Sequence, residues 1–232
     1  AGSMVFPEVG LALGHRRLSI IDLSDAGAQP MQYAGGALTI VHNGEVYNYR
    51  ELRAELEQAG YRFRSNTDTE VILAAYDFWG KDCLRRFNGM FAFAIWDSRS
   101  RNLFLARDRL GIKPLYYYHD SDRFIFASEI KSILAVLPDK PSIHAALIDE
   151  YMTFGYLPGE RTLFNGIFRL LPGNLLVYER GKIGKEQFWD FQFDNENDLG
   201  LTHYLEKFNF LINDAIDLRL RSDVPLGIFL SG

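Results

Sequence analysis

The sequence predicts a mixed α+β fold, and three observations lead to this class. Short β-like runs crowd the first half of the chain. Two segments with apolar residues at helical spacing, 48–59 and 68–79, interrupt these runs, and each is followed by a glycine. Residues 90–96 are almost entirely apolar, which is typical of a strand covered on both faces.

The remaining elements follow from the same patterns. Residues 1–4 resemble the remnant of an expression tag, and we leave them out of the predicted fold. Further strands are expected at 11–15, 18–21, 37–42, 102–107, 116–118, 124–126 and 226–230, with a hairpin around Arg180-Gly181. Further helices are expected at 128–137 (with Ser128 as N-cap), 145–154 and 204–220, and a linker at 194–200.

Composition excludes several classes of protein. The 232 residues carry a net charge of -5, so no basic field favours nucleic acid. The apolar runs are far shorter than the ~20 residues of a membrane helix, and the five histidines show no metal-ligand spacing, so we expect neither a membrane anchor nor a metal site. A single cysteine, Cys83, fits a reducing, cytoplasmic location.

The dipeptide Asn43-Gly44 is the most informative short motif. Asn-Gly between apolar segments is a strong hairpin signal, because both central residues of a type I′ turn need a positive φ. Alternatively, the glycine N–H and the asparagine side-chain amide are two donors aimed at one point, as an oxyanion hole requires. The motif by itself does not decide between the two interpretations.

Several stretches, taken in order, resemble the glutamine-hydrolysing asparagine synthetases. These stretches are 13–24, Gln29-Pro30-Met31, 43–48, Asp68-Thr69-Glu70, 88–93, 107–117, 128–131 and 221–232. The resemblance implies a glutaminase domain of the class II amidotransferase (Ntn-hydrolase) type over residues 5–193. Its fold is expected to be a four-layer αββα sandwich of two mainly antiparallel sheets. Residues 200–232 would begin an α/β ATP-pyrophosphatase domain.

The resemblance also implies the roles of individual residues. Arg17 matches the arginine that grips the α-carboxylate of glutamine, and Leu18, Ser19, Ile20 and Ile21 line the same pocket. Asn43 and Gly44 match the oxyanion hole, and Glu45 and Asp68 match the groups that hold the α-ammonium. For Asp68 a helix cap, and for Glu45 a solvent-facing side chain, are the structural alternatives.

Two segments of the family pattern are missing from this sequence. The family nucleophile is an amino-terminal cysteine on a leading strand, and Cys83 is expected to be a packed helix thiol instead. The ATP-binding loop is represented only by Leu230, Ser231 and Gly232. We therefore expect this chain to hydrolyse no glutamine by itself and to bind no cofactor, whereas the complete enzyme would use ATP with Mg²⁺.

In the complete enzyme, the ammonia would amidate an aspartate activated by ATP. Two alternatives stay open: a related synthetase with another carboxylate acceptor, or a non-catalytic binding or regulatory module. The expected partners are the small molecules glutamine, aspartate and ATP. The apolar helix at 204–220 is also expected either to pack against a second copy, as in a homodimer, or to make the chain prone to association, because it would expose a large apolar surface on a monomer.

Overall fold

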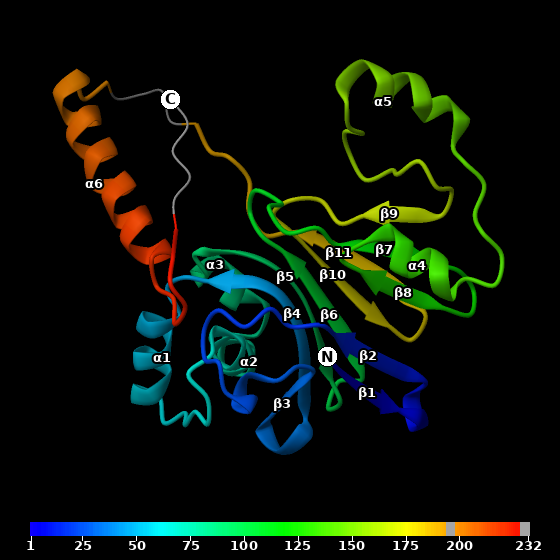
Figure 1. Ribbon diagram of the computed structural model, residues 1–232, viewed down its shortest axis with the longest axis horizontal. Helices are drawn as coiled ribbons and strands as arrows, with labels where there is room; N and C mark the ends of the chain where they lie inside the picture. Colours follow the sequence, from blue (N-terminus) through cyan, green and yellow to red (C-terminus); the bar gives the residue numbers. More distant parts are fainter. Residues whose placement is uncertain (194–197, 228–232) are drawn as a thin grey trace.

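The computed structural model describes residues 1–193 and 198–227. Its centre is a six-stranded antiparallel sheet in the order β11-β10-β6-β5-β4-β3 (Figure 1). The strands are β3 (Met31–Tyr33), β4 (Leu38–Val46), β5 (Gly89–Asp97), β6 (Asn102–Arg107), β10 (Asn174–Glu179) and β11 (Lys182–Gln187). The predicted hairpin at Arg180-Gly181 is confirmed, because β10 and β11 pair with each other across it.

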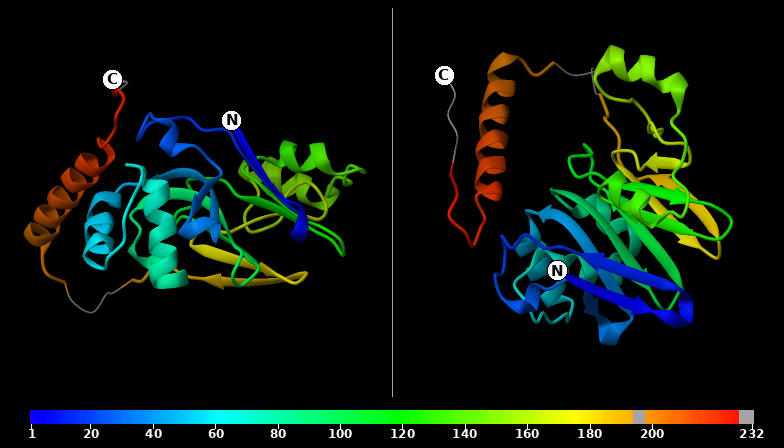
Figure 2. Two further views of the ribbon diagram at one scale, coloured as in Figure 1. Left: turned by 90° about the horizontal axis from the view of Figure 1, so that it is seen from below. Right: turned by 45° about the vertical axis from the view of Figure 1, so that its right-hand side comes forward.

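Helices cover one face of this sheet, as Figures 1 and 2 show. They are α1 (Tyr49–Gln58), α2 (Asp68–Trp79) and α3 (Cys83–Arg86). Phe91, Phe93 and Ile95 of β5 are buried against them, and the alternate residues Ala92 and Ala94 are buried on the opposite face. The prediction that 90–96 is a strand covered on both faces is therefore confirmed.

Two smaller sheets cover the opposite face. One pairs β1 (Gly2–Phe6) with β2 (Leu11–His15), and the other has the order β8-β7-β9. The second comprises β7 (Tyr116–His119), β8 (Phe124–Ala127) and β9 (Ile167–Arg169). Leu13 of β2 and Tyr117 of β7 both enter the core beneath them. The predicted second sheet is thus present as a layer, divided into two separately paired parts.

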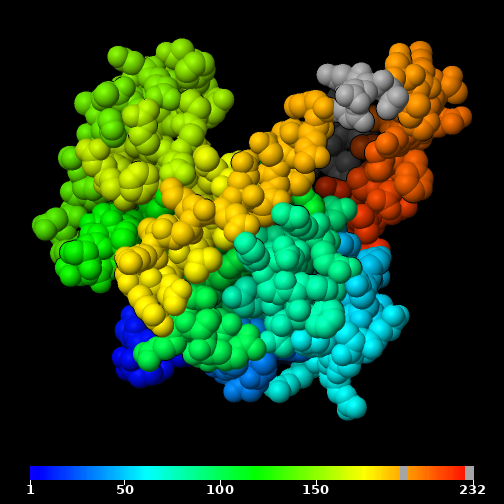
Figure 3. Space-filling model, turned by 180° about the vertical axis from the view of Figure 1, so that it is seen from behind, coloured from blue at the N-terminus to red at the C-terminus, as the bar shows by residue number. Residues whose placement is uncertain are grey.

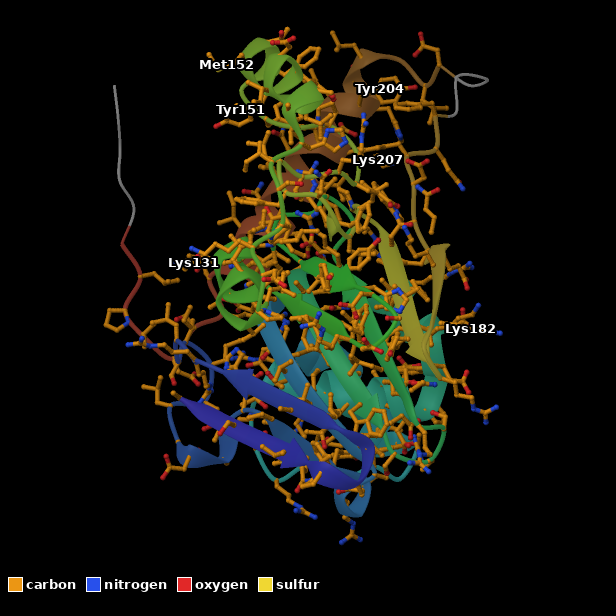
Figure 4. All side chains as sticks on the ribbon, turned by 90° about the vertical axis from the view of Figure 1, so that its right-hand side faces the viewer. Lys131, Tyr151, Met152, Lys182, Tyr204 and Lys207 are labelled. Atoms are coloured by element: carbon orange, nitrogen blue, oxygen red, sulfur yellow. The ribbon has the colours of Figure 1, made fainter. Side chains whose placement is uncertain are left out.

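The fourth layer is α4 (Ile130–Val136), which packs on the outer face of the three-stranded sheet through Ile133. Figure 4 shows α4, with Lys131 pointing away from the sheets, above the β1–β2 pair. Beyond it lies α5 (Ile148–Phe154), which carries the exposed Met152 at its outer end. Together the layers form the expected αββα sandwich. Short 3₁₀ helices occupy Pro7–Val9, Asp25–Gly27, Ala34–Gly36, Gly80–Asp82 and Ala145–Leu147.

Helix α6 (Leu201–Arg219) stands apart from the sandwich. Figure 3 shows it projecting from the body of the molecule, and none of its residues is buried. Its exposed side chains include Leu205, Phe208, Phe210, Leu211, Ile212 and Ile216. The expected apolar surface therefore exists. Within the described residues, no helix combines the length and hydropathy needed to cross a bilayer.

Three local predictions are wrong. Residues 2–4, which were left out of the predicted fold, belong to β1, and a Cβ on Gly2 would lie 2.3 Å from the carbonyl oxygen of Gln29, so this glycine is closely packed. Residues 18–21 form no strand, because the Arg17 side chain binds the backbone carbonyl of Ile21. Ser128 does not cap α4, whose N-cap is Glu129; the Ser128 hydroxyl accepts a hydrogen bond from Asn43 instead.

Most of the expected strand at 226–230 falls outside the described residues. Residues 194–197 of the expected linker fall wholly outside them. Leu226 and Gly227, which are described, are not in a strand.

Candidate functional site

A pocket of about 170 Å³ lies beside the second half of β4. Eight of the nine residues that the sequence analysis assigned to one site line it together, although they come from three separate segments of the chain. The complete lining consists of His15, Arg16, Arg17, Leu18, Ile20, Ile21, Gln29, His42, Asn43, Gly44, Glu45, Asp68, Thr69, Met90 and Lys113. Ser19 is half-buried in the same loop but does not line the pocket.

The Asn43-Gly44 dipeptide lies inside a strand, so the hairpin interpretation is wrong. Strand β4 continues without a turn to Val46 and pairs with β5 throughout, with Gly44 opposite Phe91. Gly44 has a φ of 139°, and a Cβ there would lie 2.1 Å from the carbonyl oxygen of Met90. Only glycine fits this backbone conformation. Because Gly44 has no side chain, its peptide group is exposed at the pocket.

The side-chain amide of Asn43 has a defined position. Its Nδ2 donates to Ser128 Oγ at 3.2 Å, so the six-stranded sheet is linked to the residue that follows β8. Because Nδ2 carries two protons, one remains for a ligand. The amide and Gly44 are thus adjacent groups on one wall of the pocket, which is the arrangement that an oxyanion hole needs.

Arg17 lines the pocket but also organises its rim. Its Nη2 donates to the carbonyl oxygens of Ile21 and Asp22, both at 2.6 Å, and its Nη1 donates to that of Ser24 at 3.3 Å. A guanidinium has five N–H donors, so two remain beyond these three bonds. Arg17 therefore has donors left for a carboxylate while it fixes the loop that follows it.

Two carboxylates, Glu45 and Asp68, enter the pocket from different elements. Asp68 is the first residue of α2, is buried, and accepts from the Val46 N–H at 2.9 Å. The helix cap is Thr67, whose side chain accepts from the Glu70 N–H, so Asp68 is not the cap. Glu45 is 9% exposed, so the solvent-facing alternative is wrong, and its Oε1 is buried without a hydrogen-bond partner.

The electrostatics of Glu45 follow from this burial. Desolvation is the main cause that raises its pKa to about 7, the negative charge of Asp68 acts in the same direction, and the charge of Lys113 opposes both. A cation bound between Glu45 and Asp68 would favour the ionised form of Glu45. The pocket thus offers acidic groups on one side and the arginines of the loop on another, which suits a zwitterion such as an amino acid.

Lys113 also lines the pocket, although it was not among the predicted site residues, and a buried carboxylate brings it there. Asp108 is 1% exposed and accepts hydrogen bonds from the N–H groups of Phe91, Ile112 and Lys113 at 2.9–3.1 Å. Arg107 closes the same loop by donating to the Lys113 carbonyl at 2.7 Å. The loop that follows β6 is therefore fixed by Arg107 and Asp108. The signal for Lys113 was its place in the motif 107–117.

Two histidines that were also missed lie at the boundary of the pocket. His42 is fully buried, and this burial lowers its pKa; its Nδ1 lies 3.1 Å from Thr69 Oγ1. The other ring nitrogen, Nε2, and Nδ1 of His15 are buried without hydrogen-bond partners. Buried polar groups are normally paired, so these atoms indicate a place where a ligand or another segment of polypeptide would bind.

A groove of about 630 Å³ adjoins the pocket and shares His15, Arg16, His42 and Asn43 with it. It runs between Gly14–Arg16 on one side and Ile125–Glu129 on the other, over a floor of β4 and β5. Within the described part of the chain, β2 and β8 are each the end strand of their sheet. The groove therefore lies between two strand edges, which an extended segment could pair with.

The other assigned positions are outside the pocket. Leu230, Ser231 and Gly232, expected to contact ATP, fall outside the described residues. Cys83 is the packed helix thiol that was predicted: it is buried in α3, and burial raises its pKa. Among residues 1–193 and 198–227 there is no group of three or more His, Cys, Asp or Glu that could hold a metal ion.

The αββα layers are those of the Ntn-hydrolase fold, and the pocket lies beside the Asn43-Gly44 peptide of β4. The family model described as "Glutamine amidotransferase domain" matches residues 2–189. This chain therefore belongs to the glutamine amidotransferase domain family, and its curated relatives include glutamine-hydrolysing asparagine synthetases.

Three relatives show how far the likeness extends. The chain is 38% identical to asparagine synthetase (glutamine-hydrolysing) 3 of Bacillus subtilis, over 99% of this chain and 38% of that protein. It is also 38% identical to asparagine synthetase 1 of the same organism, over 98% and 36%. It is 34% identical to the amidase chry2 of Gibberella zeae, over 96% and 33%. The chain thus spans well under half the length of each of these relatives.

Solved structures support the fold. The glutamine phosphoribosylpyrophosphate amidotransferase of Bacillus subtilis matches with a TM-score of 0.53 and 21% identity, over 77% of this chain and 35% of that one. A structure described as the allosteric regulatory enzyme of purine biosynthesis matches with a TM-score of 0.54 and 22% identity, over 77% and 35%. Identities this low show a shared fold and nothing more.

Proposed function

We propose that this chain is the glutaminase part of a glutamine-dependent asparagine synthetase. Glutamine would be hydrolysed to glutamate and ammonia, and the ammonia would amidate an aspartate activated by ATP. The observation that carries the proposal is the convergence of Arg17, Asn43-Gly44, Glu45 and Asp68 on one small pocket. The names of the curated relatives support the same activity.

Each group has a role in the proposed hydrolysis. Arg17 would bind the α-carboxylate of glutamine with its remaining donors, and Glu45 with Asp68 would bind the α-ammonium. When a thiolate attacks the side-chain amide carbon, the carbonyl oxygen becomes an oxyanion, which Asn43 Nδ2 and the Gly44 N–H would stabilise. The amide nitrogen then takes a proton and leaves as ammonia, and water hydrolyses the thioester.

The nucleophile would come from a leading strand bearing an amino-terminal cysteine, as the family resemblance implies. We propose that the groove between β2 and β8 receives this strand. The groove offers two strand edges for pairing, and it meets the pocket at His42 and Asn43, where a strand end would face the substrate amide. The free α-amino group of such a cysteine has a pKa of roughly 8 and would act as the base.

We propose the domain limits 5–193 and 200–232, with β1 extending the first domain to Gly2. The second part would start the ATP-pyrophosphatase domain, where ATP with Mg²⁺ would bind, including at Leu230, Ser231 and Gly232. The proposed location is the cytoplasm, since Cys83 is the one cysteine of the sequence.

Binding and catalysis are tested separately. Calorimetric titration of this chain with L-glutamine should show binding, and 4-carbamoylbutanoate, which lacks the α-amino group, should bind at least about tenfold more weakly. An ammonia-release assay on the same chain should show no turnover. Equal affinity for the two ligands would contradict the zwitterion pocket, and normal turnover would contradict the need for an added nucleophile.

A synthetase with another carboxylate acceptor is the second candidate, because the curated relatives do not all carry the name asparagine synthetase: one is named an amidase. The glutaminase pocket is the same in both cases, because it handles the nitrogen donor alone. Incubating the full-length gene product with glutamine, ATP–Mg²⁺ and a panel of carboxylates separates them: asparagine formed from aspartate supports the first proposal, and amidation of another carboxylate supports the second.

We also propose that α6 is covered by a second copy of the chain when the rest of the synthetase is absent. The exposed side chains of Phe208, Leu211 and Ile212 form a surface that monomers rarely display. Light scattering after size exclusion should give the mass of a dimer or larger species. A monodisperse monomer would contradict this association.

A further inference from the structure

The segment that follows α6 turns back onto the sandwich. Arg221 forms a two-pronged ion pair with Glu51 of α1, with Nη–Oε distances of 2.6 and 2.7 Å, and also donates to the Tyr47 carbonyl at 2.9 Å. Arg219 stacks on the Tyr47 ring, 4.7 Å from its centre. Figure 1 shows this turn of the chain, in red, directly above α1. Although α6 is exposed, the residues after it are thus anchored.

Asp223 extends this anchor to the rim of the pocket. Its N–H donates to the Ile20 carbonyl at 3.0 Å, and its Oδ2 accepts from the Asp22 N–H at 2.7 Å. Ile20 and its neighbour Ile21 line the pocket. Two hydrogen bonds therefore join residue 223 to a loop about two hundred positions earlier, at the point where that loop forms the pocket wall.

Asp22 has a backbone conformation that needs such support. Its φ is 53°, in the left-handed region, which costs free energy for a residue other than glycine and persists only where the surroundings hold it. Arg17 binds its carbonyl at 2.6 Å, and its carboxylate accepts from the N–H groups of Ser24 at 3.1 Å and Asn66 at 2.8 Å. The N–H of Asp22 donates to Asp223 Oδ2.

The contact with Asn66 connects the rim to the acidic side of the pocket. Asn66 immediately precedes Thr67, the N-cap of α2, and Asp68 is the first residue of that helix. Asp22 thus lies between the Arg17 side of the pocket, the start of α2 and the segment after α6. A change in the position of Asp223 would act on both charged sides of the pocket through this residue.

We propose that Asp223 is a positioning residue, which holds the rim 20–22 in the form that binds glutamine and links the pocket to the polypeptide beyond α6. This inference rests on the proposed function, because the ligand of the pocket is taken to be glutamine. The linkage is reciprocal: displacement of residues 221–224 weakens glutamine binding, and bound glutamine stabilises their docked position by the same factor.

The test compares Asp223→Ala with Asp223→Asn. The asparagine oxygen can still accept from the Asp22 N–H, whereas alanine cannot. Amide exchange of Asp22, measured by NMR without glutamine, should be about tenfold faster in Asp223→Ala, as expected for the loss of one charge-assisted hydrogen bond. Calorimetry should show a Kd for L-glutamine about five- to tenfold higher in Asp223→Ala. Asp223→Asn should restore both values to within about twofold.

Asp217→Ala is the matched control, because Asp217 is an exposed carboxylate on α6 and should change neither value. Unchanged amide exchange at Asp22 in Asp223→Ala would show that Asp223 does not hold the rim 20–22. Faster exchange with an unchanged Kd would overturn the positioning role. If the unsubstituted chain binds no glutamine, the proposed function and the positioning role fail together, while the exchange rates still show whether Asp223 holds the rim.

Discussion

The side-chain amide of Asn43 and the hydroxyl of Ser128 lie 3.2 Å apart and connect the two β layers of the sandwich. Asn43 is on β4, at the pocket, and Ser128 directly follows β8, at the adjoining groove. The contact orients the amide without using both of its protons. A donor held in this way needs little reorganisation when charge develops on a substrate oxygen.

Replacing Asn43 by alanine should therefore affect turnover far more than binding. In the full-length gene product we expect Asn43→Ala to lower kcat for glutamine hydrolysis by about 10²- to 10³-fold, with KM changed by only a few-fold. Ser128→Ala keeps the amide but releases it, and should lower kcat by less than about tenfold. Steady-state ammonia release measures both, and a kcat for Asn43→Ala near that of the unsubstituted enzyme would exclude the oxyanion role.

Gly44 should tolerate no side chain. The Cβ of Gly44→Ala would meet the Met90 carbonyl at 2.1 Å, in a backbone with φ of 139°. Because both the collision and the φ oppose it, we expect a loss of about 2–4 kcal/mol in the free energy of unfolding, measured in urea. Gly184→Ala is the control, since nothing lies within 4 Å of a Cβ there. Equal stability of the two variants would contradict the geometry of β4.

The raised pKa of Glu45 predicts a pH-dependent stability. Its pKa is about 7 in the folded protein and 4.5 as an unperturbed side chain, so the folded state binds more protons between these values. The free energy of unfolding therefore falls as pH rises through this window, by up to about 3 kcal/mol. Glu45→Gln removes this dependence and should be more stable than the parent at pH 8.

At pH 5 the parent carboxyl is protonated, and the two proteins should have similar stability. Urea titrations at both pH values give the difference. A stabilising effect of Glu45→Gln that is the same at pH 5 and pH 8 would show that the cause is packing and not the charge.

Asp68 combines a structural hydrogen bond with a proposed ligand contact, and two variants separate them. Asp68→Asn can still accept from the Val46 N–H, so stability should change by less than about 1 kcal/mol. The lost charge should raise the Kd for L-glutamine by at least about tenfold. Asp68→Ala should in addition lower the free energy of unfolding by about 1–3 kcal/mol, because a buried N–H loses its partner. Unchanged affinity in Asp68→Asn would assign this residue to structure alone.

Cys83 should be unreactive while the protein is folded. It is buried in α3, and its raised pKa keeps the thiol protonated. A colorimetric disulfide reagent at pH 8 should modify the chain in denaturant but at least about a hundredfold more slowly without it. Rapid modification of the native protein would show that the region around α3 opens readily.

Many elements follow from the sequence alone. Helices α1 and α2 and strand β6 have the predicted bounds to within one or two residues, because their signals are local: apolar residues at helical spacing with a glycine after each helix, and a short apolar run for the strand. Two of the wrong predictions, the strand at 18–21 and the Ser128 cap, failed because the side chains of Arg17 and Ser128 bind elsewhere. Ser128 has the right residue type for a cap, but its hydroxyl binds Asn43 from a distant strand.

What the sequence determined by itself was therefore the α+β class, most of the elements and, through its motifs, the family and the main pocket residues. Only the tertiary structure decided that Asn43-Gly44 lies in a strand, that Lys113 and His42 join the pocket, and that Asp223 contacts its rim. The physical reason is the separation along the chain of the residues that determine each feature. Helix and strand patterns depend on neighbouring residues, whereas a site depends on sheet register and on loops fixed by buried polar groups such as Asp108.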